Sequence, residues 1–158
     1  MSRSVVTIAL AVAAAAVSFA PAALAAHVHT FKATYTGHGA GEATATAASG
    51  HASATGSGNV IGRSTLSGRA TGVVQSPTCV AFNGRATLKG SGGSIVLRAR
   101  GARACASGTG ANVAFTGTAT VTGGTRKFAG ARGTLSFTGV YANETASVTI
   151  AFKGRITY

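Results

Sequence analysis

The chain offers few side chains that could carry out acid–base or metal chemistry. Glu42 and Glu144 are its only acidic residues, and 14 Lys and Arg give the 158 residues a formal net charge of +12. Catalytic carboxylate pairs, calcium loops and carboxylate-bound magnesium need more acids than these. The nucleophile-elbow, dinucleotide-binding, phosphate-loop and His-Glu-x-x-His motifs are also absent from the sequence. The sequence therefore favours a non-catalytic protein over an enzyme, and it predicts no cofactor.

All four histidines lie early in the chain, at His27, His29, His38 and His51. The His27-x-His29 pair is a donor set that suits Cu²⁺, Ni²⁺ or Zn²⁺, but no further ligand follows at a diagnostic spacing. Only a glutamate could orient a histidine for nucleophilic chemistry, and Glu144 lies in a predicted turn. We expect exposed histidines and no metal site.

Residues 1–25 have the pattern of an export signal. A positive charge at Arg3 precedes an apolar run over residues 5–19, and small residues at 23–25 form a cleavage site. The apolar run is shorter than the roughly 20 residues that a membrane span needs. We therefore expect a secreted or cell-envelope protein with one mature domain, 26–158, and no transmembrane span after cleavage. The abundance of Arg, Ala and Gly is typical of a GC-rich bacterial genome.

Two cysteines, Cys79 and Cys105, occur in this chain. In an exported protein such a pair predicts one structural disulfide, because extracellular compartments are oxidising. A disulfide between them would close a loop of about 27 residues, which stabilises a fold by roughly 3 to 4 kcal/mol on the chain-entropy model.

Alternation of apolar and polar residues indicates β-strands. Apolar residues take every second position over 148–156, 113–121 and 135–141, with mainly Thr, Ser, Lys and Arg between them. Weaker alternation marks further strands near residues 28–36, 60–68, 80–88 and 95–101. Residues 40–57 carry no large apolar side chain, so they form either a small-residue strand or a loose loop. Seven or eight strands separated by Gly-rich turns predict an all-β, antiparallel fold.

Many apolar residues are followed by a glycine two positions later, as Phe115 is by Gly117 and Phe137 is by Gly139. Residues two apart share one face of a strand, so each glycine leaves a space beside a large side chain on the inner wall. Such glycines let strands coil sharply and favour closure of the sheet. We predict a barrel of about eight strands, with a β-sandwich as the alternative.

The segment from Val121 to Gly139 contains Gly-Gly-Thr-Arg-Lys-Phe-Ala-Gly-Ala-Arg-Gly. It resembles the hairpin of the allene oxide cyclase-like and dirigent-like β-barrels, and departs from it at Arg126, where those families usually have glycine. The resemblance implies an eight-stranded barrel with an apolar interior. Dirigent-like members are associated with acidic cavity residues, usually Asp, and this chain has no Asp to take that role. Only the fold is therefore expected to carry over.

Six aromatic residues are predicted to line the interior. They are Phe31, Phe82, Phe115, Phe137, Tyr141 and Phe152. In a barrel of about eight strands such side chains either fill the core or surround one small ligand.

Most basic residues occupy the strand positions that alternate with the apolar ones. They should therefore face solvent. The predicted polyanion-binding set is Arg63, Arg69, Arg85, Lys89, Arg98, Arg100, Arg126, Lys127, Lys153 and Arg155. A basic outer wall attracts anionic envelope polymers through a salt-dependent interaction, or simply keeps an exported protein soluble. Sequence-specific nucleic-acid binding is not expected, because no aromatic residues interleave with these charges.

Two functional hypotheses follow. The favoured one is an exported, non-catalytic envelope or extracellular barrel that binds polyanions through its outer face. The alternative is a small barrel that binds or isomerises an apolar small molecule inside. A filled interior favours the first and a hollow interior favours the second. The sequence does not determine the oligomeric state.

Overall fold

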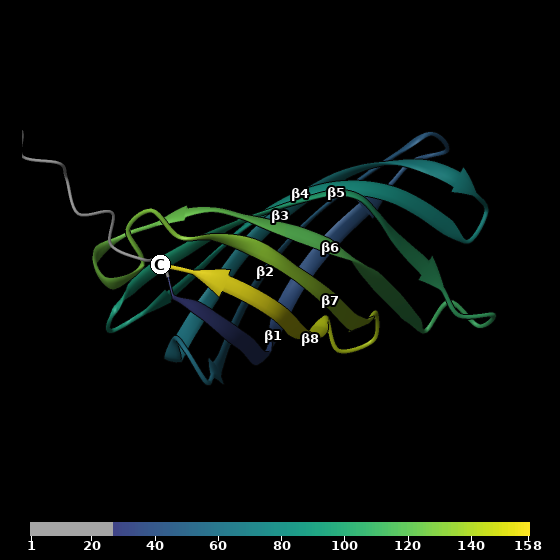
Figure 1. Cartoon of the computed structure of the whole chain (residues 1–158). Helices are drawn as coiled ribbons and strands as arrows, with labels where there is room; N and C mark the ends of the chain where they lie inside the picture. Colours follow the sequence, from purple (N-terminus) through teal and green to yellow (C-terminus); the bar gives the residue numbers. More distant parts are fainter. Residues whose placement is uncertain (1–26) are drawn as a thin grey trace, which may run out of the picture.

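The computed structural model describes residues 27–158, which form a closed antiparallel barrel (Figure 1). Each of its eight strands pairs with its sequence neighbours, and the last strand closes the barrel by pairing with the first. The strands are β1 (Val28–Ala43), β2 (Ala47–Gly58), β3 (Gly62–Ser76), β4 (Cys79–Gly90), β5 (Gly93–Ala106), β6 (Asn112–Gly124), β7 (Arg132–Ala142) and β8 (Ser147–Thr157). The predicted all-β, eight-stranded barrel is thus confirmed.

The predicted signal peptide at residues 1–25 lies outside the described residues. Within the described part, the one helical element is the short 3₁₀ helix η1 (Arg126–Phe128) between β6 and β7. Nothing helical there is long and apolar enough to cross a membrane.

The alternation of the sequence corresponds to an inner and an outer wall. In β8, Val148, Ile150 and Phe152 are buried, whereas Lys153 and Arg155 are exposed. The Ala- and Gly-rich residues 40–57 belong to two strands, because β1 continues to Ala43 and β2 begins at Ala47. Cross-strand pairing of β2 with both β1 and β3 holds this segment as sheet despite its small side chains.

A β-bulge in β5 interrupts the alternation. The sequence pattern placed Gly101 on the inner wall, but Gly101 is exposed with a φ of 62°. Arg100 and Gly101 lie between the partners of Gly84 and Phe82, and the Gly101 amide donates to Oδ1 of Asn83 at 3.0 Å. The extra residue shifts the parity, so that Ala102 is buried instead.

One end of the barrel is closed by side chains. The β6–β7 connection and the C-terminus lie together at this end (Figure 1). Phe128 of η1 is buried and packs edge-on against Tyr158, with ring centroids 5.1 Å apart. His29 stacks on the same Tyr158 ring at 4.5 Å. Below them the core is filled by Phe31, Leu88, Ile95, Leu135 and Ile156, all of which are fully buried.

A buried polar pair lies within the core. The hydroxyls of Tyr35 and Ser64 are 2.8 Å apart, and Ser64 also donates to the Gly62 carbonyl at 3.3 Å. Burial raises the pKa of Tyr35, and the hydrogen bond with Ser64 opposes that rise. Tyr35 also packs edge-on against Phe152, with ring centroids 6.1 Å apart.

Arg126, the residue at which the sequence departs from the hairpin that it resembles, lies between β6 and β7. Arg126 has a φ of 53°, in the left-handed region where glycine is the favoured residue. An arginine there is strained by its own Cβ.

Substitutions on the two walls test the parity of β6 and β7. A Cβ at Gly117 would lie 2.6 Å from the Ala102 Cβ and 2.8 Å from Cζ of Phe137, and one at Gly139 would lie 2.5 Å from the Thr149 carbonyl oxygen. We expect Gly117→Val and Gly139→Val each to lower the free energy of unfolding by about 1 to 3 kcal/mol. Thr118→Val and Thr138→Val, on the exposed face, should change it by about 0.5 kcal/mol or less. Equal losses on both faces in urea denaturation would show that the parity is wrong.

Relief of strain at η1 gives a second expectation. Arg126→Gly should raise the free energy of unfolding by about 0.5 to 1 kcal/mol, because glycine adopts the left-handed conformation without strain. Lys127→Gly is the matched control. Lys127 holds its ammonium group 5.7 Å from the Phe128 ring centroid and 5.5 Å from that of Tyr158, so its loss should destabilise the fold. A lower urea midpoint for Arg126→Gly than for the parent protein would contradict the assignment of strain.

The buried tyrosine makes stability depend on alkaline pH. Because the folded pKa of Tyr35 lies above its unfolded value of 10.0, the stabilisation is fully present below about pH 10 and is lost as pH rises through the folded pKa. Tyr35→Phe should cost about 1 kcal/mol at neutral pH through the lost hydrogen bond to Ser64. It should also make urea midpoints fall less steeply above pH 10. Parallel pH profiles for the two proteins would rule out this contribution.

Candidate functional site

The half of the barrel away from η1 is hollow. It contains a cavity of about 420 Å³, within the range of small-molecule pockets. The rim is formed by residues beside the β1–β2 and β7–β8 turns, among them Ala43, Ala48 and Asn143. The cavity therefore opens at the end of the barrel opposite η1.

Aromatic rings form one wall of this cavity. Phe82 from β4, Phe115 from β6, Phe137 from β7 and Phe152 from β8 all line it. The Phe137 ring centroid is 6.4 Å from those of Phe82 and Phe115, and 6.0 Å from that of Phe152. Phe82 and Phe115 are only partly buried, so their rings have faces free to contact a ligand.

The facing wall, on β1 to β3, is built from residues with almost no side chain. Its inner positions are Gly39, Gly41, Gly50, Ala52, Gly68, Ala70 and Gly72. A normal set of Leu, Ile or Val there would fill the space, as it does at the η1 end. The absence of large apolar side chains from residues 40–57 was the signal of this cavity, although the sequence pattern alone left strand and loop open for that segment.

Two polar side chains make hydrogen bonds at the mouth of the cavity. The Tyr141 hydroxyl donates to the Gly39 carbonyl at 3.4 Å, and the Asn143 side chain donates to the Gly110 carbonyl. Within residues 27–158, the buried side-chain hydroxyls of Tyr35 and Ser64 bond to each other in the core, and neither residue lines the cavity. The cavity is therefore equipped to enclose and stack on an apolar ligand, with the Tyr141 hydroxyl as a polar contact near the entrance.

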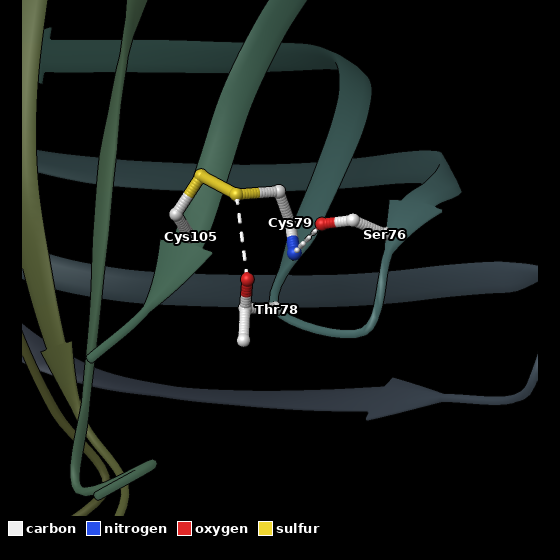
Figure 2. Close-up of a disulfide and its surroundings, with 4 residues drawn as sticks. All are labelled: Ser76, Thr78, Cys79 and Cys105. Atoms are coloured by element: carbon white, nitrogen blue, oxygen red, sulfur yellow. Dashed lines mark hydrogen bonds between the residues drawn. A yellow bond between two sulfur atoms is a disulfide. The ribbon is translucent and has the colours of Figure 1, made fainter. Parts of the chain in front are cut away.

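The predicted disulfide is present and lies at the open end (Figure 2). Cys79 begins β4, Cys105 lies near the end of β5, and the two residues are directly paired across the strands. The Cys79 amide donates to the Ser76 hydroxyl at 3.1 Å, and the Thr78 hydroxyl is 3.9 Å from the Cys79 sulfur. The disulfide therefore links β4, the strand that carries Phe82, to β5 at the rim of the barrel.

The aromatic residues singled out from the sequence divide between the two halves of the barrel. Phe31 is fully buried in the filled half. The other five line the cavity, namely Phe82, Phe115, Phe137, Tyr141 and Phe152.

The predicted basic residues are distributed over several faces. Arg126 and Lys127 lie in η1 at the closed end, and Lys153 and Arg155 lie on β8. The strands β3, β4 and β5 carry Arg63, Arg69, Arg85, Lys89, Arg98 and Arg100. Arg103, which is not in the predicted set, is also exposed on β5 beyond the bulge.

The four histidines are dispersed: His27 precedes β1, His29 and His38 lie on β1, and His51 lies on β2. In the described part of the chain, no three His, Cys, Asp or Glu side chains lie close enough together to hold a metal ion.

Comparisons with known proteins show a fold relationship. No protein-family model matches the chain, and no curated protein matches it. A solved structure named pyocyanin demethylase is similar with a TM-score of 0.53 and 16% sequence identity, over 81% of this chain and 99% of that one. At this identity the likeness shows the barrel fold alone. The relationship to allene oxide cyclase-like and dirigent-like proteins stays a prediction.

Proposed function

We propose that this protein binds an apolar small molecule in the open half of its barrel. The observation that carries the proposal is the cavity of about 420 Å³, lined by aromatic rings on one side and by Gly and Ala on the other. The similar structure, pyocyanin demethylase, is by its name a protein that acts on a small molecule, which supports this use of the fold.

The lining restricts the chemistry of the ligand. A charged group buried among these rings would lose its hydration without a partner, so the ligand is neutral where it enters the barrel. Four Phe rings favour a ligand that itself contains rings, since aromatic pairs gain about 0.5 to 1.5 kcal/mol beyond the burial of their area. A polar substituent is accommodated at the mouth, near Tyr141 and Asn143.

Export to an oxidising compartment is part of the same proposal. The Cys79–Cys105 bond supports it, because structural disulfides are rare in reducing compartments. An extracellular or envelope location would bring the open cavity into contact with small molecules outside the cell.

A neutral fluorescent probe tests the binding proposal. N-phenyl-1-naphthylamine brightens in apolar surroundings, and the protein has no Trp to interfere with its signal. We expect saturable enhancement with one probe per chain and a Kd on the order of micromolar.

A cavity-filling variant supplies the decisive comparison. Ala70 lines the cavity and stands directly opposite Gly84, so the Phe ring of Ala70→Phe has space only within the cavity. We expect this variant to weaken probe binding by roughly tenfold or more, since it displaces the ligand. Ser67→Phe, exposed on the same strand, is the matched control and should bind like the parent protein. Undiminished affinity in a folded Ala70→Phe protein, or equal losses in both variants, would refute binding inside the barrel.

A further inference from the structure

Three arginines stand side by side on the outer wall. Arg69 of β3 is directly paired with Arg85 of β4, which is directly paired with Arg98 of β5. Arg69 and Arg85 are exposed, and Arg98 is half-buried. His51 of β2 is paired with Arg69 and extends the row by one strand. We call His51, Arg69, Arg85 and Arg98 the cationic row.

Further positive charges flank the cationic row. Lys89 on β4, and Arg100 and Arg103 on β5, are all exposed. The acidic residues of the chain lie elsewhere, Glu42 on β1 and Glu144 in the turn between β7 and β8. Through its cross-strand partners Glu42 aligns with the bulge at Arg100, four strands away, or roughly 19 Å at normal strand spacing. That distance is beyond the reach of an ion pair.

The row has an energetic cost in the folded protein. Like charges directly opposite each other on neighbouring strands repel and destabilise the sheet. No acid on β2 to β5 offsets this repulsion. Solubility alone requires a net charge and does not require that arginines be aligned. An external anion would relieve the repulsion and gain charge-assisted hydrogen bonds from each guanidinium.

We propose that the cationic row binds a linear polymer of phosphate groups. Its three guanidinium groups repeat every 4.7 to 4.9 Å across the strands and span about 10 Å from Arg69 to Arg98, so they match a chain with closely spaced negative charges. His51 adds a hydrogen-bonding imidazole one strand further along. The planar guanidinium fork suits phosphate oxygens. The parallel rows, Ser67 with Thr87 and Thr71 with Asn83, add hydroxyl and amide groups. Aromatic side chains are not among the outward residues of these rows, so bases have no stacking platform.

Inorganic polyphosphate is the probe for this proposal. Affinity should fall at least tenfold between about 50 and about 300 mM NaCl, as counterion release requires. The double variant Arg69→Gln/Arg85→Gln should bind roughly tenfold more weakly at the lower salt, with a smaller slope of log affinity against log salt. Since the substitutions remove repulsion, this variant should be at least as stable to urea as the parent protein.

The matched control removes the same charge elsewhere. Lys153→Gln/Arg155→Gln lies on β8, four strands from β4 around the barrel, and should change polyphosphate affinity by less than about threefold. Equal losses in the two double variants would overturn the proposal in favour of a general charge effect. Tighter binding of single-stranded oligothymidylate or of phosphatidylglycerol vesicles than of polyphosphate would overturn the choice of partner. Loss of polyphosphate binding in the row variant alone would support it.

Discussion

The interior of a closed eight-stranded barrel holds only the side chains that its strands point inward, and that constraint governs this protein. Strand number fixes the internal width, so the sizes of the inward residues decide where the barrel is filled. In the filled half, Phe31, Tyr35 and Leu88 are fully buried in one hydrophobic core and exclude solvent. Toward the other end, Gly and Ala take most inward positions of β1 to β3 and leave a cavity under the rings of Phe82 and Phe115. A single fold thus supplies both a core and a binding site.

The same alternation separates two kinds of surface on each strand. On β3, Ala70 faces the cavity while the adjacent Arg69 belongs to the cationic row outside. An apolar ligand inside and an anionic polymer outside would therefore contact different side chains of the same strands. The disulfide between Cys79 and Cys105 fixes the rim of β4 and β5, which contribute to both surfaces.

The sequence predicted those features that depend on local pattern. Alternation identified the inner and outer walls, and two cysteines allowed one bridge. The sequence did not predict the bulge at Arg100 and Gly101, because the alternation of residue types does not show where one strand has an extra, unpaired residue. The alignment of Arg69, Arg85 and Arg98 depends on the register between strands, which turns and bulges determine. Whether the interior is filled or hollow could not be predicted, because the segment that forms much of the cavity wall lacks the large apolar residues on which strand prediction depends.

Xenon binding in a crystal tests the central claim, that the barrel is filled at one end and hollow at the other. Xenon under pressure enters apolar cavities and scatters strongly enough to be located. We expect xenon density among Phe82, Phe115 and Phe137, in the half of the barrel away from η1. We expect none between Phe31 and Leu88, where the core is closed. An open half occupied by collapsed side chains, with xenon absent from it, would contradict the account.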